Sequence, residues 1–204
     1  MISIEGGIGA GKTSVLRKLA ERLGERTLVV EEPVADWIRL GLLRRSAQRP
    51  LPFQMAVLTS LVSVHGRALR GAQGRLLVTE RSAKSNREVF ARANLTSDAL
   101  DFYDYTYGEL RKLEPDLFER HHPHVFLAVP VDTLMDRIRS RGRAEEVDLS
   151  VDYMRRIEDA HHQWMQRLDA DDVIVVDGTA PTDCVADAIV AELVARRLLG
   201  AATT

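Results

Sequence analysis

A glycine-rich motif near the start of the chain restricts the possible folds more than any other part of the sequence. Residues 6–13 read Gly-Gly-Ile-Gly-Ala-Gly-Lys-Thr and match the pattern G-x-x-x-x-G-K-[ST] in full. Apolar residues precede the motif and an apolar helical stripe follows it, so it joins a strand to a helix. The backbone N–H groups of such a loop and the N-terminus of the helix bind phosphate oxygens. We therefore expect the loop to bind ATP.

The residues of this loop have separate expected roles. Lys12 is expected to reach the β- and γ-phosphates, and Thr13 offers its hydroxyl to Mg²⁺. ATP and Mg²⁺ are therefore the predicted cofactors. The alternative is an accidental glycine-rich turn, but the motif and its context agree. The predicted ATP contacts are Gly6, Gly7, Ile8, Gly9, Ala10, Gly11, Lys12, Thr13 and Ser14.

Short apolar segments alternate with longer helical patterns along the rest of the chain. The apolar segments are nearly continuous, which is typical of strands buried on both faces of a parallel sheet. The alternation predicts an α/β fold, a five-stranded parallel sheet flanked by helices, in one domain over residues 1–204. The predicted strands are 1–5, 27–31, 75–80, 124–129 and 172–177. The predicted helices include 15–23, 53–69, 153–168 and 181–199, with a further packed helix over 95–118.

Composition limits the partners and the compartment. The formal net charge of −2 gives no general attraction for nucleic acid or anionic membranes. No apolar run reaches the roughly 18 residues that span a bilayer, and the start of the chain lacks the features of a signal peptide. The lone cysteine, Cys184, suits a reducing compartment. We expect a cytoplasmic protein, or a nuclear one in a host with a nucleus, with no nucleic-acid or membrane partner.

Acidic residues follow the second and third predicted strands. Pro33 disfavours a helical backbone at Glu32, so Glu32 is expected to be extended at the strand end, near the phosphate loop. A carboxylate there is able to accept a proton from an attacking hydroxyl. Glu80 follows the third strand, where phosphate-loop enzymes place the acidic residue that orients Mg²⁺. The alternatives are a solvated acidic turn at Glu32 and an ion pair between Glu80 and Arg81.

A short run of histidines, residues 121–124, precedes the fourth predicted strand. Its three imidazoles are candidate metal ligands. No cysteine accompanies them, however, and a turn is expected before the strand. We predict a surface turn here rather than a metal site.

Taken in order, these and later motifs resemble the deoxyribonucleoside kinase family, which has animal, insect and herpesviral members. The resemblance covers residues 2–164 and implies a P-loop kinase fold with an Arg-rich lid at about 137–148. It implies an enzyme that transfers the γ-phosphoryl group of ATP to the 5′-hydroxyl of a deoxynucleoside, and a homodimer. The shared motifs are the phosphate loop, E-P-V-x-x-W at 32–37, F-Q at 53–54, E-R-S at 80–82 with a later Phe, and R-x-x-x-R-x-R-x-E-E at 137–146.

The resemblance implies a role for each residue around the acceptor nucleoside. Glu32 would be the base that activates the 5′-hydroxyl, and Arg81 would hold the 5′ end and assist Glu32. Gln54 would pair with the edge of the base, and Trp37 would line the pocket. Phe90 would stack on the base, which is favourable by about 1–3 kcal/mol. Phe90 lies on an apolar stripe, so a place in the core is equally open for it.

The lid is implied to act on the sugar and on the transferring group. Glu146 would bind the 3′-hydroxyl, and Arg137, Arg141 and Arg143 would contact the transferring phosphoryl group. Arginines supplied by a closing lid suit a reaction that depends on positioning and charge stabilisation. The alternative is a solvated basic helix end that pairs with Glu145 and Glu146.

Three positions bear on the choice of base: Val57, Leu61 and Asn86. Members of the family that prefer deoxycytidine carry Arg and Asp at the last two, whereas Leu61 leaves room for a thymine methyl group. We therefore expect thymidine, or a broad pyrimidine range, as the acceptor. The family usually has a Tyr upstream of the F-Q pair that shares the 3′-hydroxyl with the Glu, but no Tyr lies between Trp37 and Gln54 here.

Other functions are compatible with parts of the pattern. A nucleoside monophosphate kinase resembling thymidylate kinase also joins a phosphate loop to an E-P segment. Those kinases place Arg before the E-P, where this chain has Glu31. Two carboxylates, Glu31 and Glu32, at the acceptor site would repel a phosphate dianion but tolerate a neutral hydroxyl. A non-catalytic ATP-binding module is the remaining alternative.

Overall fold

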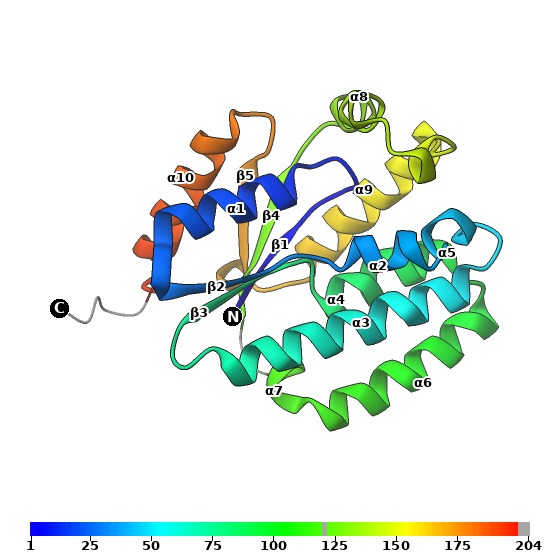
Figure 1. Ribbon diagram of the computed structural model, residues 1–204, viewed down its shortest axis with the longest axis horizontal. Helices are drawn as coiled ribbons and strands as arrows, with labels where there is room; N and C mark the ends of the chain where they lie inside the picture. Colours follow the sequence, from blue (N-terminus) through cyan, green and yellow to red (C-terminus); the bar gives the residue numbers. More distant parts are fainter. Residues whose placement is uncertain (120–121, 200–204) are drawn as a thin grey trace.

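A five-stranded sheet, with all of its neighbouring strands parallel, forms the centre of the molecule (Figure 1). The computed structural model describes residues 1–119 and 122–199. The strand order is β2-β3-β1-β4-β5, which confirms the α/β prediction. Each strand begins and ends within two residues of its predicted bounds. The strands are β1 (Ile2–Glu5), β2 (Thr27–Val30), β3 (Leu76–Glu80), β4 (His124–Ala128) and β5 (Val173–Asp177).

Helices cover both faces of the sheet (Figure 1). One face carries α1 (Lys12–Leu23) and α10 (Thr182–Ala195). The other carries α3 (Pro50–Gly71), α4 (Ala83–Ser85), α6 (Ser97–Leu113), α7 (Pro115–Phe118) and α9 (Val151–Gln166). After the carboxyl ends of β2 and β4 come α2 (Val34–Arg39) and α8 (Val131–Arg141). A π-helical segment, Asn86–Ala91, and the short α5 (Arg92–Asn94) follow α4.

The central strand β1 is buried on both sides because helices lie above and below it. Ile2 and Ile4 are 1% and 0% exposed, and all four residues of the strand are buried. On α1, the predicted stripe is confirmed, since Val15, Leu16, Leu19 and Leu23 are all buried in the same core. This packing fixes the loop between β1 and α1 against the middle of the sheet.

Several predicted helix bounds differ from the structure, among them those around Pro115, at Pro50 and in the last helix. The helix expected over 95–118 is two helices, because Glu114 precedes Pro115 and adopts a non-helical backbone. The helix expected from residue 53 begins earlier, at Pro50, since proline is tolerated in a first turn. The last helix ends at Ala195, four residues before its predicted end at 199.

The histidines near β4 are not a surface turn in the part of the chain that the structure describes. His122 and His124 are 3% and 2% exposed, and His121 lies outside the described residues. His124 opens a central strand, where its Nδ1 lies 2.7 Å from Ser3 Oγ and its ring packs on Trp164. A hydrogen-bonded imidazole is thus accommodated in the core. No group of three or more His, Cys, Asp or Glu able to hold a metal ion occurs among the described residues.

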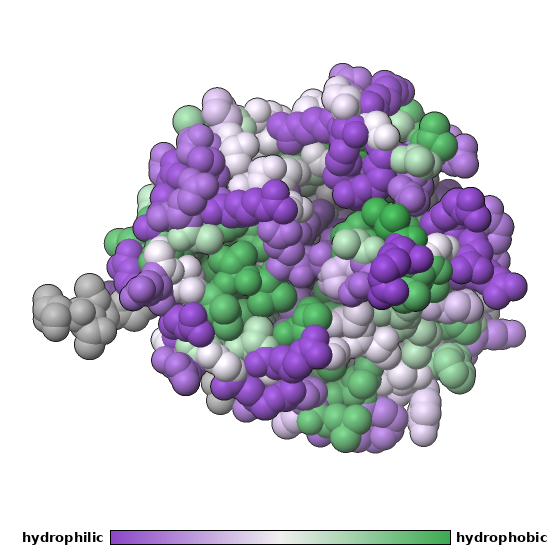
Figure 2. Space-filling model, in the orientation of Figure 1, coloured by the Kyte–Doolittle hydropathy of each residue, from purple (hydrophilic) through white to green (hydrophobic). Residues whose placement is uncertain are grey.

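The surface is mostly hydrophilic in the view of Figure 2. A hydrophobic patch lies between α1 and α3, over the edge strand β2, whose residues 28–30 are half-buried (Figure 2). Within the described ranges, every helix is too short or too polar to cross a membrane.

The core contact between α1 and the sheet can be tested by truncation. Leu19 is 0% exposed, so Leu19→Ala should lower the free energy of unfolding by about 2–5 kcal/mol. Leu113→Ala is the control, because Leu113 is 75% exposed and its truncation should cost less than about 0.5 kcal/mol. Denaturant unfolding of both variants measures the difference. Equal effects would contradict this account of the core.

Candidate active site

The phosphate loop runs from the end of β1 into α1. Gly9 has a φ of +87°, and a Cβ there would lie 2.9 Å from the carbonyl oxygen of Leu134, so the loop needs glycine at this position. Lys12 Nζ donates to the carbonyls of Gly6 and Gly7, at 3.1 and 3.0 Å. The lysine is 6% exposed, and burial lowers the pKa of its ammonium group. The loop carbonyls thus hold the Lys12 charge over the loop.

The other residues predicted to bind ATP lie in the same turn or in the first turn of α1, which begins at Lys12. They are Gly6, Gly7, Ile8, Gly9, Ala10, Gly11, Thr13 and Ser14. A loop of this shape directs backbone N–H groups and a helix N-terminus toward one point.

Thr13 and Glu80 lie side by side next to the loop. Thr13 Oγ1 donates to both carboxylate oxygens of Glu80, at 2.8 and 3.0 Å. Burial, with a further contribution from the nearby Glu32, raises the pKa of Glu80. A hydroxyl and a carboxylate are the oxygen ligands that Mg²⁺ prefers, and a cation here would offset the repulsion between the two acids. The residues present therefore fit a Mg²⁺ ion.

Glu32 pairs with Arg81 rather than facing solvent. Arg81 Nε donates to Glu32 Oε1 at 2.5 Å, and the side chains of Arg81 and Glu32 are only 7% and 8% exposed. Arg81 Nη1 is buried without a hydrogen-bond partner among the described residues. The alternative of an ion pair between Glu80 and Arg81 is wrong, since Glu80 binds Thr13 instead. A carboxylate and an unsatisfied guanidinium N–H thus lie together at the carboxyl ends of β2 and β3.

The backbone at Arg81 is unusual. Its φ is +64°, in the left-handed region that side chains other than glycine rarely adopt. The Arg81 N–H donates to the Ile4 carbonyl at 3.0 Å, which ties the residue to β1. Such strained positions cluster at functional sites, where the surrounding structure holds them in place.

Glu31 does not lie at this site, contrary to the prediction. Arg17 donates to both of its carboxylate oxygens at 2.7 and 3.0 Å, on the exposed surface. Neighbouring side chains of an extended segment point to opposite sides, so Glu31 faces away from Glu32. The second carboxylate beside Glu32 is that of Glu80.

Three residues predicted to line the nucleoside pocket pack together. Trp37, Val57 and Leu61 form one buried cluster, on which Phe53 also packs. Trp37 Nε1 donates to Ser60 Oγ at 3.1 Å, which fixes the indole against α3. We call this cluster the apolar wall, and Val34, two residues after Glu32, packs against it.

Asn86 and Phe90 come from the π-helical segment, and both are buried. Asn86 Nδ2 donates to Gln54 Oε1 at 2.9 Å, so the structure brings together the two polar residues expected at the base. The Arg81 guanidinium lies 3.8 Å from the centroid of the Phe90 ring, and His161 contacts the ring edge-on. Phe90 is also part of a core cluster. The core alternative therefore describes its packing here, with one ring face covered by Arg81.

The lid arginines are bound within the chain. Arg137 donates to the carbonyl of Ala10 at 3.3 Å and to that of Gly178 at 3.0 Å. Arg143 Nη1 donates to Glu146 Oε1 at 2.7 Å, and Arg141 bonds the other oxygen of the same carboxylate. Glu146 is 6% exposed. The lid thus lies close to the phosphate loop, and Glu146 neutralises two of its charges.

Comparison with known proteins identifies the family. A family model described as deoxynucleoside kinase matches residues 2–197. The chain belongs to the deoxynucleoside kinase family. The resemblance seen in the motifs is confirmed, and this deoxynucleoside kinase is an ATP-dependent phosphotransferase.

The proteins similar to this kinase are named for different nucleosides. It is 28% identical over 204 residues to a thymidine kinase of Ictalurid herpesvirus 1 (strain Auburn), covering 95% of this chain and 85% of the relative. It is 27% identical to deoxycytidine kinase of Homo sapiens, covering 80% and 74%. A solved deoxyadenosine kinase from M. mycoides, with products dCMP and a flexible dCDP bound, superposes with a TM-score of 0.78 at 18% identity, covering 95% and 98%. The expected P-loop kinase fold is confirmed.

One acidic residue of the kinase site was not predicted. Glu158 of α9 is 5% exposed, and a Cβ on Gly7 would lie 2.1 Å from its Oε1. Burial raises the pKa of Glu158 to about 7, although the Lys12 charge and the Gly7 amide act to lower it. The sequence contains one signal for it, an acidic residue next to Ile157 on the apolar stripe of α9.

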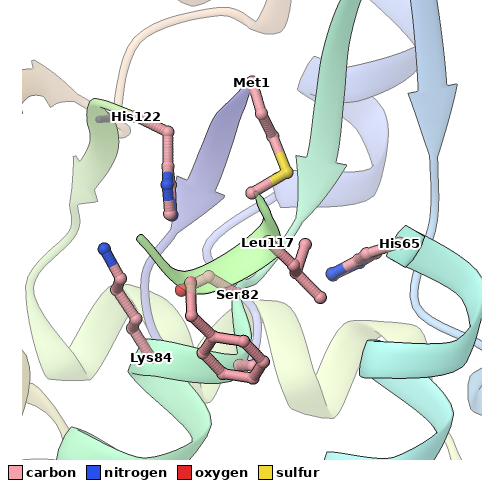
Figure 3. A pocket seen from close by; sticks show the side chains of 8 residues that line it. Met1, His65, Ser82, Lys84, Leu117 and His122 are labelled. Atoms are coloured by element: carbon pink, nitrogen blue, oxygen red, sulfur yellow. The ribbon is translucent and has the colours of Figure 1, made fainter. Parts of the chain in front are cut away.

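A small hollow beneath α4 and α7 does not suit a nucleoside. Figure 3 shows its lining, with His65 and His122 on different sides of it. Its empty space is about 190 Å³, below the roughly 300 Å³ of the smallest usual ligand pockets. Burial lowers the pKa of His65 to about 4, so its ring is neutral at physiological pH. The lining residues are Met1, His65, Ser82, Ala83, Lys84, Leu117, Phe118 and His122.

The raised pKa of Glu158 predicts a pH-dependent cost to folding. Between its ordinary value of 4.5 and about 7, the unfolded chain is ionised here while the folded chain keeps the proton, so stability falls as pH rises. Above pH 7 the full cost, on the order of 3 kcal/mol, remains. Glu158→Gln should therefore stabilise the protein at pH 8 and leave it unchanged near pH 4, as measured by denaturant unfolding. The exposed Asp169→Asn is the control, and a pH-independent effect of Glu158→Gln would contradict the prediction.

Proposed function

We propose that this kinase transfers the γ-phosphoryl group of ATP to the 5′-hydroxyl of thymidine, or of a broad range of pyrimidine deoxynucleosides. The observation that carries the proposal is the buried Glu32–Arg81 pair beside the phosphate loop. A carboxylate at that place is suited to receive a proton from a neutral hydroxyl. It is unsuited to a phosphate dianion, since Glu80 adds a second acid next to it.

The proposed reaction begins with the 5′-hydroxyl hydrogen-bonded to Glu32. As the 5′-oxygen forms its bond to the γ-phosphorus, its proton passes to the Glu32 carboxylate, and the bond from the γ-phosphorus to the bridging oxygen breaks to release ADP. Arg81 orients Glu32 through the 2.5 Å contact. Its Nη1, which is buried without a hydrogen-bond partner among the described residues, would donate to the 5′-oxygen or to the transferring group. Lys12 and the arginines at 137, 141 and 143 would stabilise the charge on the phosphoryl oxygens.

Mg²⁺ is the proposed metal, held by Thr13 and Glu80. When bound, it would neutralise charge on the β- and γ-phosphate oxygens. The contact between the Thr13 hydroxyl and the Glu80 carboxylate supports this assignment, because it already brings the two oxygen ligands together.

The nucleoside would lie between the apolar wall and Gln54. The burial of Trp37, Val57 and Leu61 in one cluster supports this placement. Phe90 is expected near the base as well, because the Arg81 guanidinium lies on its ring. Glu146 is the proposed partner of the 3′-hydroxyl. Because two lid arginines bond its carboxylate, this role requires substrate binding to exchange those contacts.

The proposed assembly is a homodimer. The candidate contact face is on α6, where Phe102 and Tyr105 are 57% and 69% exposed. Large apolar side chains gathered on one helix are typical of surfaces that associate.

The role of Glu32 is tested by Glu32→Gln. Loss of the proton acceptor should lower kcat by about 10²- to 10⁴-fold, while the KM for ATP changes less than about twofold, because the phosphate loop is untouched. Glu31→Gln is a matched control one residue away, since its carboxylate is bound to Arg17 at the surface. Steady-state kinetics measure both. Full activity of Glu32→Gln would refute the proposed base.

The acceptor is tested by a turnover screen with ATP and Mg²⁺. The four natural deoxynucleosides and thymidine monophosphate are compared side by side at equal concentration. We expect thymidine to be phosphorylated fastest, followed by deoxycytidine. A purine preference would contradict the pyrimidine assignment, and a preference for thymidine monophosphate would contradict the neutral acceptor.

A further inference from the structure

A chain of hydrogen bonds leads from the interior of the protein to the proposed base site. Tyr103 of α6 donates its hydroxyl to Asn86 Oδ1 at 2.5 Å, and Asn86 Nδ2 donates to Gln54 Oε1 at 2.9 Å. The three residues are 0%, 1% and 3% exposed. Tyr103 therefore lies behind Asn86, to which its hydroxyl is hydrogen-bonded.

The donor-to-acceptor direction of these two hydrogen bonds is set at their buried end, by Tyr103. Burial raises the pKa of Tyr103 well above its ordinary value, so its hydroxyl keeps its proton and has to donate it. Within the described residues, the acceptor of that proton is Asn86 Oδ1. The NH₂ group of Asn86 then points toward Gln54, and the side-chain carbonyl oxygen of Gln54 accepts a hydrogen bond from it. One buried hydroxyl thus fixes the orientation of two amides.

The fixed amides present a definite pattern to a base. Gln54 keeps its Nε2 group as a donor. Among the described residues, this nitrogen is not one of the buried side-chain atoms that lack a hydrogen-bond partner. Next to it, Gln54 Oε1 has a second lone pair, and Asn86 Nδ2 has a second N–H. Followed from Gln54 Nε2 through Gln54 Oε1 to Asn86 Nδ2, these groups come in the order donor, acceptor, donor.

Among the bases of the four deoxynucleosides of DNA, thymine alone complements this order. Thymine offers acceptor, donor, acceptor at O4, N3–H and O2, a pattern that reads the same in both directions. Cytosine offers donor, acceptor, acceptor, because an amino group replaces O4. Adenine also carries an amino group there, and guanine carries one at the other end of its edge. The match with thymine therefore holds whichever way the base enters the pocket.

We infer that Tyr103 is a positioning residue for base choice, which locks Asn86 and Gln54 so that the pocket accepts a 4-oxopyrimidine deoxynucleoside in preference to a 4-aminopyrimidine one. This inference rests on the proposed function and deepens it. Without the hydroxyl, both amides are free to turn together. With both amides turned, Gln54 and Asn86 present the order acceptor, donor, acceptor. This order pairs with the amino group and N3 of cytosine, but not with its O2.

The test compares thymidine with deoxycytidine in Tyr103→Phe. The phenylalanine ring keeps the packing of Tyr103 against Leu58 and Phe118 and removes only the hydroxyl. The wild-type enzyme should favour thymidine in kcat/KM, and the variant should narrow the ratio about tenfold, the effect of one mispaired hydrogen bond. The change should lie mainly in the KM for the nucleoside, with the KM for ATP unaltered. Tyr107→Phe on the same helix is the control, because Tyr107 packs against the same cluster while Asn86 Oδ1 accepts its proton from Tyr103.

A second variant keeps the test decisive if Tyr103→Phe does not fold. Asn86→Asp removes the NH₂ group, so Gln54 has to turn its own NH₂ toward the carboxylate, and the preference should shift toward deoxycytidine. An unchanged thymidine-to-deoxycytidine ratio in the folded variants would overturn the inference. A wild-type preference for deoxycytidine would overturn it as well. Failure to phosphorylate any of the four deoxynucleosides would instead overturn the proposed function, and the inference with it.

Discussion

The parallel alignment of β1, β2 and β3 is the constraint on which the candidate site depends. Parallel strands end at the same edge of a sheet, so the residues that follow them meet in space although they are far apart in the chain. The phosphate loop follows β1, Glu32 follows β2, and Arg81 follows β3. The hydrogen bond from the Arg81 amide to β1 adds a direct link between these segments. Because β1 is buried on both faces, the loop and the acid–arginine pair share one rigid support.

The electrostatics at this edge explain why several of its groups have shifted pKa values. Three carboxylates, Glu32, Glu80 and Glu158, lie around a loop built to receive an anion. Burial disfavours the charged forms of Glu80, Glu158 and Lys12, while Lys12 and Arg81 supply positive charge beside the carboxylates. A divalent cation that binds with a triphosphate would offset part of its negative charge. Either alone would leave unpaired charge in a poorly hydrated place.

Local pattern predicted much of this molecule, and the reasons for its failures are physical. The five strands and the phosphate loop were found because buried parallel strands have continuous apolar runs and because the loop motif needs glycines. Glu31 was misplaced because neighbouring side chains of an extended segment point to opposite sides. The motif does not show which of the two faces the site. His124 was misjudged because a hydrogen bond to Ser3 makes a buried imidazole tolerable. Tyr103 was missed because its role arises from a contact between α6 and the π-helical segment.

The π-helical segment at 86–91 has a consequence for how this pocket can vary between proteins. A π turn contains one residue more than an α turn, and each residue of an α-helix advances by about 100° around the axis. Deleting a single residue between Asn86 and Phe90 would restore the α repeat and leave the aromatic ring and the amide on nearly the same face of the helix. The same pocket wall is therefore reachable with or without the extra residue, while the sheet and the phosphate loop stay intact. Alignments of homologues across this segment therefore need a gap of one residue to be considered before side chains are equated.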